Sequence, residues 1–100
     1  EIDNKKTFYC HKEVELDIAK HCVKINGKDV PFARKEFDLL KLLISTPGKV
    51  FTRGDILEQV WGTDIYVGDR TIDVHINRLR DKIYQDYIKT IKGIGYKLTD

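Results

Sequence analysis

Residues 69–83, with the sequence DRTIDVHINRLRDKI, decide the fold of this chain because they combine one apolar side with one polar side. With about 100° between successive residues of a helix, the apolar residues fall within a stripe roughly 60° wide. These residues are Ile72, Ile76, Leu79 and Ile83. The spacing predicts a helix whose apolar stripe is buried. The opposite pole of the helix carries Arg70, Val74, Asn77, Arg78 and Asp81.

The polar side of this helix carries the residue types that contact DNA. Arginine forks match guanine edges and phosphates, asparagine pairs with adenine, and an apolar side chain can meet a thymine methyl group. Val74 is such an apolar residue on an otherwise polar pole. A solvated surface is the alternative, and residues 69–83 alone favour that simpler interpretation. The flanks of the pole carry Thr71, His75 and Lys82 on one side and Asp73 and Arg80 on the other.

A β-hairpin is predicted directly after this helix, over residues 87–98. The run YIKTIK at 87–92 leads into Gly93-Ile94-Gly95, whose glycines allow the positive φ of a tight turn, and YKL follows at 96–98. Lys92 lies at the tip. Such a hairpin is typical of a wing, where the helix enters the major groove and the hairpin reaches backbone or minor groove. The alternative is a hairpin that only covers the core.

Two further helices are predicted upstream. Residues 35–44, KEFDLLKLLI, form an apolar helix that ends at Thr46-Pro47-Gly48, where proline blocks continuation and glycine turns the chain. A second helix begins after Thr52 as N-cap, with Asp55 as the capping acid. This order of elements is that of a winged helix-turn-helix. The second helix has an apolar edge of Ile56, Leu57, Val60 and Trp61, and a loop follows at 62–68.

The first third of the chain alternates apolar and polar residues, as short strands do. The alternation runs through Phe8 and Cys10, residues 14–18 and residues 23–25, and Asn26-Gly27 is typical of a type I′ hairpin turn. We expect three or four short antiparallel strands that pack against the first helix. The predicted fold class is therefore α+β, with an N-terminal antiparallel sheet at 7–32, a three-helix core at 34–83 and a wing hairpin at 87–98.

Four blocks of sequence lie on these predicted elements. They are RKEFDLL at 34–40, VWG at 60–62, residues 70–83, and TIKGIGY at 90–96. In their order and separations, the blocks resemble the OmpR/PhoB-type effector domain of bacterial two-component response regulators, over nearly the whole chain. Four blocks together are far more specific than one, so the resemblance favours a DNA-contacting helix over a solvated one.

The resemblance implies a winged helix with a four-stranded N-terminal sheet, three helices and a C-terminal hairpin, acting as a sequence-specific transcription regulator. Helix 69–83 would enter the major groove of double-stranded DNA, and the wing at 88–98 would meet backbone or minor groove. Two copies would bind as a dimer, on direct-repeat half-sites. The implied contacts are Arg70, Thr71, Val74, His75, Asn77, Arg78 and Arg80 on the helix, with Trp61, Thr90 and Lys92 outside it.

Three positions depart from the family pattern. Ala33 stands where the first helix usually opens with threonine, so an N-cap hydroxyl is missing, at a cost of about 0.5–2 kcal/mol. Asn77 and Lys92 stand where many relatives carry arginine. Because asparagine and arginine read different base edges, the operator sequence does not transfer from the family.

Composition and charge fit one small domain. The 100 residues, 41% of them hydrophobic, can bury one core, and no stretch is long enough to span a bilayer or to serve as a signal peptide. We therefore expect a cytoplasmic chain. The net charge of +2 is low for a DNA-binding protein, although seven basic side chains face five acidic ones from residue 69 onward. This modest surplus indicates modest monomer affinity and favours dimerisation on DNA.

The sequence has the features of an excised fragment. It contains no methionine, and residues 1–6, EIDNKK, look like the remnant of a linker. In the resembled family this linker joins a receiver domain, which a cognate sensor kinase phosphorylates on aspartate. We expect that receiver domain to be absent here, so no carboxylate of this chain is read as the phosphate acceptor.

Catalysis, cofactors and metals are not expected. Cys10-His11 and His21-Cys22 contain zinc-binding residue types, but neighbouring strand residues point to opposite faces and do not converge. Both cysteines are expected to be reduced. Gly93-Ile94-Gly95 lacks the helix that a phosphate-binding loop needs, and His75 is interpreted as a flank residue near phosphate rather than a general base.

The loop at 62–68 displays Ile65, Tyr66 and Val67 between two glycines. These apolar residues either fold back onto the core or form a contact surface. In the resembled family this loop can contact RNA polymerase holoenzyme, which implies a role in activation. A second function class stays open for the whole chain, namely a protein-interaction module that has lost DNA binding. The residues that favour DNA binding over this second class are Arg70, Arg78, Arg80 and Lys92.

Overall fold

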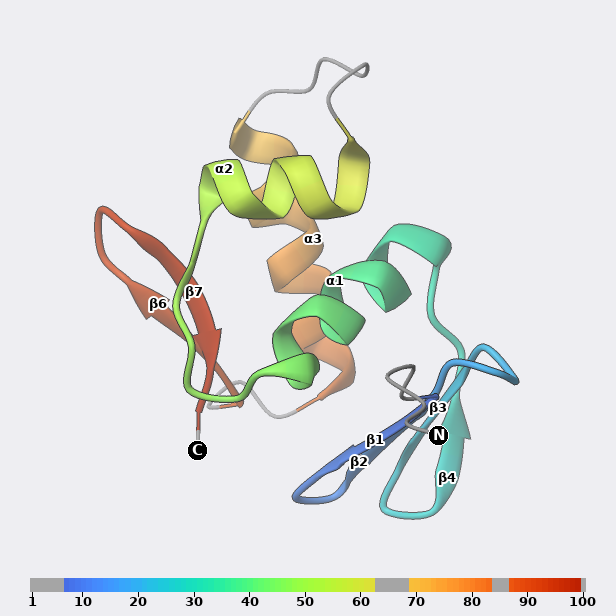
Figure 1. The fold of residues 1–100 in the computed structure, drawn as a ribbon. Helices are drawn as coiled ribbons and strands as arrows, with labels where there is room; N and C mark the ends of the chain where they lie inside the picture. The colour runs from blue at the N-terminus through green and yellow to red at the C-terminus, as the bar shows by residue number, and fades with distance from the viewer. Residues whose placement is uncertain (1–6, 63–68, 84–86, 100) are drawn as a thin grey trace, which may run out of the picture.

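Two small antiparallel sheets lie at the edges of a helical core in the computed structural model of this chain (Figure 1). The structure describes residues 7–62, 69–83 and 87–99, and the side chains of Asp69 and Arg70 lie outside that description. The elements are β1 (Phe8–His11), β2 (Val14–Asp17), β3 (Cys22–Ile25), β4 (Lys28–Val30), α1 (Arg34–Ser45), β5 (Phe51–Thr52), α2 (Arg53–Ile56), η1 (Leu57–Trp61), α3 (Asp69–Lys82), β6 (Ile88–Ile91) and β7 (Gly95–Leu98). The predicted α+β winged-helix fold is confirmed.

The N-terminal sheet consists of β1 to β4, paired antiparallel in sequence order. Asn26 and Gly27 have φ values of 56° and 81°, as both central residues of a type I′ turn require. The alternate residues Val14, Leu16 and Val23 are buried in the same core as the apolar side of α1. The predicted strands, their hairpin turn and their packing against the first helix are therefore confirmed. In β1, however, Phe8 and Cys10 are exposed and Tyr9 packs against the core, so the apolar side assigned to this strand is wrong.

Helices α1 and α2 begin with different caps. Ala33 offers no side-chain acceptor, but its own N–H donates to the Glu36 carboxylate at 3.1 Å, so one half of a capping box is kept without the threonine. At α2 both halves are present: the Asp55 N–H donates to the Thr52 hydroxyl at 3.0 Å, and the Thr52 N–H donates to the Asp55 carboxylate at 3.2 Å. The predicted cap at Thr52 is confirmed.

The sequence pattern implied a regular second helix, but the structure shows a helix that changes its hydrogen-bond pattern. After one turn of α2 it widens into the π-helical segment η1, where the Gly62 N–H donates to the Leu57 carbonyl at 2.9 Å. Val60 and Trp61 are both buried, each 8% exposed, and Lys35 from α1 donates to the Val60 carbonyl at 2.9 Å. The wider turn therefore goes together with tertiary contacts, which residue spacing does not reveal.

The second sheet contains a strand that the sequence analysis missed. The order is β5-β7-β6, with Phe51 opposite Tyr96 and Thr52 opposite Gly95. A two-residue strand is too short to show alternation, so no local pattern predicts it. A Cβ at Gly95 would lie 1.9 Å from the Phe51 carbonyl oxygen, so this glycine serves close backbone approach. Of the two hairpin glycines assigned to positive φ, only Gly93, at 77°, has it.

Candidate nucleic-acid interface

Helix α3 has the two faces that its sequence predicts. Ile72, Ile76 and Leu79 are fully buried, and Ile83 directly after the helix is 7% exposed. The opposite pole is open: Val74 is 45% exposed. The other open side chains of this pole are Asn77, Arg78 and Asp81. The buried stripe and the exposed pole are both confirmed, and nothing is described of the Arg70 side chain.

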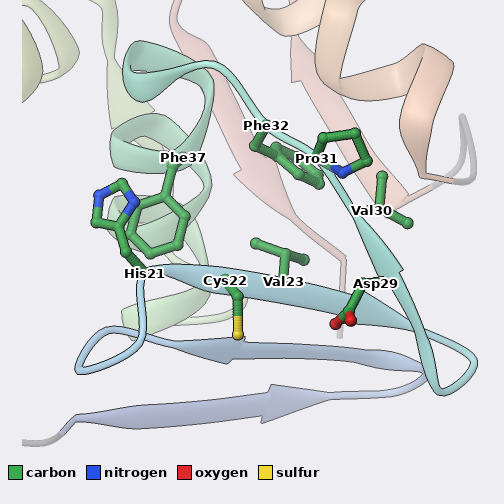
Figure 2. A pocket seen from close by; sticks show the side chains of 8 residues that line it. All are labelled: His21, Cys22, Val23, Asp29, Val30, Pro31, Phe32 and Phe37. Carbon is green, nitrogen blue, oxygen red and sulfur yellow. The ribbon is translucent and has the colours of Figure 1, made fainter.

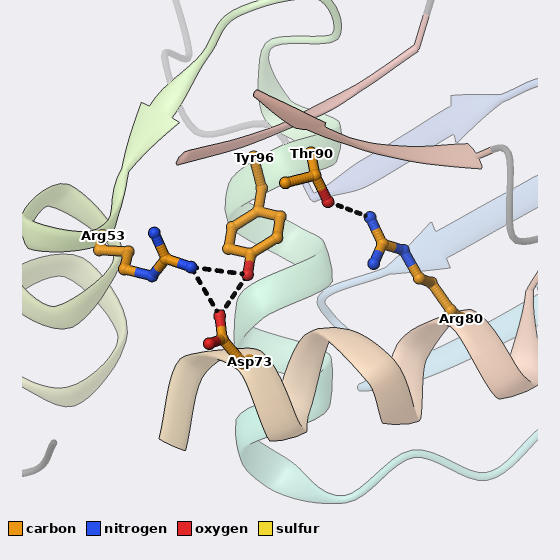
Figure 3. Close-up of polar contacts among 5 residues, drawn as sticks. All are labelled: Arg53, Asp73, Arg80, Thr90 and Tyr96. Atoms are coloured by element: carbon orange, nitrogen blue, oxygen red, sulfur yellow. Dashed lines mark hydrogen bonds and ion pairs between the residues drawn. The ribbon is translucent and has the colours of Figure 1, made fainter. Parts of the chain in front are cut away.

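One flank of α3 is tied to the wing hairpin formed by β6 and β7 (Figure 3). Arg53, at the start of α2, donates to the Asp73 carboxylate at 3.0 Å and to the Tyr96 hydroxyl at 3.3 Å. The Tyr96 hydroxyl itself donates to the same Asp73 oxygen. Further along the flank, Arg80 donates to the Ile88 carbonyl at 2.9 Å and to the Thr90 hydroxyl at 2.7 Å.

These contacts hold Asp73 in its charged form. The hydrogen bond from Tyr96 lowers the pKa of the Asp73 carboxyl, burial opposes this, and the Arg53 hydrogen bond and charge lower the pKa further. Burial raises the pKa of Tyr96, as do the hydrogen bond to the Asp73 carboxylate and its negative charge. At neutral pH, Asp73 is therefore an anion that accepts hydrogen bonds from a neutral phenol and a guanidinium group.

The other flank of α3 faces η1 and α1. The Nδ1 atom of His75 donates to the Thr71 carbonyl at 2.8 Å, so Nε2 is the ring nitrogen left for other contacts. The edge of the His75 ring packs against Trp61, with ring centroids 5.1 Å apart. Lys82 donates to the Glu36 carboxylate at 2.7 Å and to the Pro31 carbonyl at 2.9 Å. Both flanks are thus packed, and the exposed pole lies between them.

Glu36 is the buried acid of this second flank. Its side chain is 4% exposed, against 32% for Lys82. Burial raises the pKa of Glu36, but the hydrogen bonds from Lys82 and from the Ala33 N–H, with the positive charges of Lys82 and Arg78, together leave that pKa below its usual value. The Glu36–Lys82 ion pair therefore fixes α3 against the start of α1.

The tip of the wing is open. Gly93, with its φ of 77°, lies in the turn, and the Ile94 N–H donates to the Ile91 carbonyl at 2.9 Å. Lys92 is exposed, and Ile94 is 52% exposed. The strands next to the turn also leave Lys89 and Thr90 exposed.

The predicted contact residues divide into three groups. The freely exposed ones are Val74, Asn77, Arg78 and Lys92. Those also engaged within the protein are His75, Arg80 and Thr90 through their side chains and Thr71 through its backbone carbonyl, and Trp61 is packed inside with only 8% of its surface exposed. The side chain of Arg70 and the whole of Ile65, Tyr66 and Val67 lie outside the described residues.

Sequence reasoning missed the partners of Asp73. It placed Asp73 and Arg80 on one flank of the helix but assigned no role to Arg53 or Tyr96. One signal in the sequence could have indicated these contacts: Asp73 and Arg80 are oppositely charged, lie about two helical turns apart and share a flank next to the predicted hairpin. Which residue would meet Asp73 depends on the missed strand β5, since β5 leads directly into Arg53.

The cysteine-histidine pairs are dispersed. Strand β2 separates Cys10 on β1 from Cys22 on β3, and two strand spacings of about 4.8 Å exceed the reach of a disulfide. His11 contacts the Thr99 carbonyl at 2.6 Å, and His21 stacks on Phe37 with centroids 3.8 Å apart. Within the described part of the chain, no three His, Cys, Asp or Glu side chains gather as a metal site requires.

A pocket of about 320 Å³ lies beside His21 (Figure 2). It is formed between the β3–β4 hairpin and the beginning of α1, away from the α3 pole. Its apolar walls include Val23, Phe32 and Phe37, and Asp29 lies at one side.

No helix in residues 7–62, 69–83 or 87–99 combines the length and apolar character needed to cross a membrane.

Comparison with known proteins places the chain in one family. The family model described as "Transcriptional regulatory protein, C terminal" matches residues 27–98. The sensory transduction protein RegX3 of Mycolicibacterium smegmatis is 46% identical over 91 residues, which cover 85% of this chain and 40% of that protein. The chain thus spans less than half the length of this relative.

Solved structures share the fold. The response regulator DrrB, a Thermotoga maritima OmpR/PhoB homologue, has a TM-score of 0.86 and 37% identity, over 96% of this chain and 46% of that one. The Klebsiella pneumoniae RstA DNA-binding domain, solved in complex with the RstA box, has a TM-score of 0.83 and 26% identity, over 94% of this chain and 98% of that one. The chain therefore belongs to the OmpR/PhoB-type family of DNA-binding domains found at the C-terminus of transcriptional regulatory proteins.

Proposed function

We propose that this domain binds duplex DNA in a sequence-specific manner and thereby controls transcription, with helix 69–83 in the major groove. The observation that carries the proposal is the open pole of α3. Val74, Asn77 and Arg78 are exposed there between two packed flanks. Their side chains supply a methyl contact, an amide that can pair with adenine, and a guanidinium fork for guanine or phosphate.

The wing supplies the second contact of the proposed complex. Lys92 and Lys89 are exposed on the hairpin that is tied to the flank of α3. Lysine side chains bind phosphate as point charges and carry little base information. We therefore assign the wing at 88–98 to backbone or minor-groove contact and α3 to base readout.

The direct test is the salt dependence of duplex binding. Phosphate contacts release counterions, so the logarithm of the binding constant should fall linearly with the logarithm of salt concentration, by about 0.9 for each neutralised phosphate. Lys24→Ala serves as a control for the loss of any surface lysine, because Lys24 is exposed on the N-terminal sheet. This substitution should leave the slope of the binding constant against salt concentration unchanged. Absence of binding at low salt would favour a protein-interaction module instead.

The family membership supports a wider arrangement, which we also propose. The domain is the output part of a longer cytoplasmic response regulator, whose receiver domain is phosphorylated by a cognate sensor kinase. Two copies bind direct-repeat half-sites as a dimer. Light scattering of the domain with duplexes that carry one or two half-sites tests this stoichiometry: two copies should bind the longer duplex, with higher affinity per copy.

We further propose that Ile65, Tyr66 and Val67 contact RNA polymerase holoenzyme. In a full-length regulator, Tyr66→Ala should leave DNA affinity and thermal stability near wild type while reducing transcription from a target promoter. Loss of DNA binding or early melting would assign the loop a structural role. Unchanged transcription with intact folding would remove these side chains from activation.

A further inference from the structure

The wing is hydrogen-bonded to α3 through one pair of residues that face each other across its two strands. Thr90 on β6 lies directly opposite Tyr96 on β7. Tyr96 is tied to Asp73, and Thr90 is tied to Arg80. Both ties therefore run from the same flank of α3 to a single rung of the hairpin (Figure 3).

Arginine side chains also enclose the Tyr96 ring. The guanidinium carbon of Arg53 lies 5.4 Å from the ring centroid, and that of Arg80 lies 5.9 Å away. Both distances are within the range of cation–π attraction. Tyr96 as a whole is only 4% exposed, so the two arginines contact a packed side chain.

The hydrogen bonds of Asp73 and Arg80 restrain the orientation of the hairpin relative to α3, whereas apolar packing does not. Ile88 and Leu98 of the hairpin are buried in the core, and this burial favours any arrangement that keeps the same area from water. Hydrogen bonds depend on distance and angle. Because Asp73 and Arg80 are about 10 Å apart along the axis of α3, two ties at these positions limit rotation of the hairpin against the helix.

We propose that Asp73, Arg80, Thr90 and Tyr96 are positioning residues that set the wing against α3, so that Lys92 and the exposed pole engage one duplex together. This inference rests on the proposed DNA-binding function. It gives Arg80 and Thr90 a positioning role beside the direct contact expected from the resemblance, since one guanidinium nitrogen of Arg80 donates to both the Thr90 hydroxyl and the Ile88 carbonyl. It also gives a role to Asp73, a negative charge next to a DNA-binding surface.

The test uses Lys92→Ala as a probe of wing contact, in two backgrounds. The positioning variant is Tyr96→Phe with Thr90→Val, which removes the two hydroxyl groups but changes neither charge nor volume greatly. The control background is Tyr87→Phe, which removes a hydroxyl that donates to the His11 carbonyl, away from α3. The ligand is a duplex selected from a random pool by the wild-type domain.

In the wild-type and Tyr87→Phe backgrounds, Lys92→Ala should reduce the salt slope by about 0.9, because one phosphate contact is lost. In the positioning variant the slope should already be lower by that amount, and Lys92→Ala should change it no further. A variant that only unfolds in part lowers the active fraction without changing the slope, so the slope separates positioning from stability.

Three results would overturn the inference. An equal effect of Lys92→Ala in the positioning variant and in the wild type would mean that the wing is placed without these hydroxyl groups. A Tyr87→Phe background that behaves like the positioning variant would mean that wing contact is lost while the hydrogen bonds of Asp73 and Arg80 are kept, so that these bonds do not set the wing. A wild-type domain that selects no duplex would overturn the proposed function itself, which the first two results leave intact.

Discussion

The two sheets of this domain are attached to the helices in different ways. The N-terminal sheet packs through fully buried apolar residues such as Val14 and Leu16, in a core shared with Phe37 of α1. The wing sheet also buries apolar residues, but it is joined in addition to the flank of α3 by the hydrogen bonds of Asp73 and Arg80. Apolar burial is non-directional, whereas hydrogen bonds fix angles.

This difference separates stability from orientation. We expect changes in the N-terminal sheet to alter the free energy of unfolding and to leave the DNA-binding geometry of the folded domain intact. We expect changes in the ties between α3 and the wing to alter binding geometry with smaller effects on unfolding. The following predictions test this separation, beginning with the largest expected effect.

Leu16→Ala should produce the largest loss of stability. Leu16 is fully buried in β2, and truncation of a buried leucine to alanine costs about 2–5 kcal/mol because it removes apolar contacts and leaves a cavity. Urea denaturation measures the loss, and the salt slope of DNA binding by the folded fraction should match that of the wild type. A loss below about 1 kcal/mol would contradict the importance of this apolar attachment.

Gly95→Ala should destabilise the wing sheet through its backbone. The added Cβ would lie 1.9 Å from the Phe51 carbonyl oxygen, so β5 and β7 must separate, at a cost of about 1–3 kcal/mol. Gly54→Ala is the matched control, since its Cβ would meet only the Thr52 hydroxyl, at 3.8 Å. We expect this control to be neutral or stabilising by up to about 1 kcal/mol. Equal effects of the two substitutions in thermal melts would contradict the close approach of β5.

Acid should weaken the polar attachments of α3 selectively. Glu36 and Asp73 both have folded pKa values below their usual ones, so their contribution is present above the unfolded values near pH 4 and is lost as pH falls through the folded values. Glu36→Gln should flatten the dependence of unfolding free energy on pH below about 4. Asp73→Asn should have a smaller effect, since it should reduce the change in unfolding free energy over this pH range by under about 1 kcal/mol, because the Asp73 side chain is 43% exposed.

The measurement for this third prediction is urea denaturation across about pH 2.5–7, a range that extends about 1.5 units below and about 3 units above the usual carboxyl pKa near 4. Asp38→Asn is the control, since Asp38 is a partly exposed acid on α1. A pH profile of Glu36→Gln that coincides with the wild type would contradict the proposed strength of the Glu36–Lys82 pair.

The parts of the fold predicted from sequence are those that repeat locally. The spacing of Ile72, Ile76 and Leu79 defines the buried side of α3, and Asn26-Gly27 defines a turn through its own backbone preferences. Strand β5 has no such pattern, because it exists only through its pairing with β7, more than forty residues away in the chain. The π-helical turn of η1 likewise accompanies a contact from Lys35 on another helix.

The candidate site divides in the same way. The exposed pole with Val74, Asn77 and Arg78 follows from helical geometry alone, so the sequence predicts it correctly. The engagement of Arg80 by the wing depends on tertiary structure, and a sequence shows only that Arg80 is basic and on a flank. Charge and residue type therefore identify candidates for DNA contact, and packing decides which of them are free.

The substitution Arg78→Ala tests the central claim, that the open pole of α3 reads DNA sequence, most directly. Arg78 is exposed and at the middle of that pole, and Arg34 is an exposed arginine at the first turn of α1 that serves as the matched control. On a duplex selected by the wild-type domain, Arg78→Ala should cost about 1–3 kcal/mol of binding free energy. It should cost clearly less on random duplex, and Arg34→Ala should change neither affinity. Equal losses for Arg78→Ala on selected and random duplexes would contradict the claim.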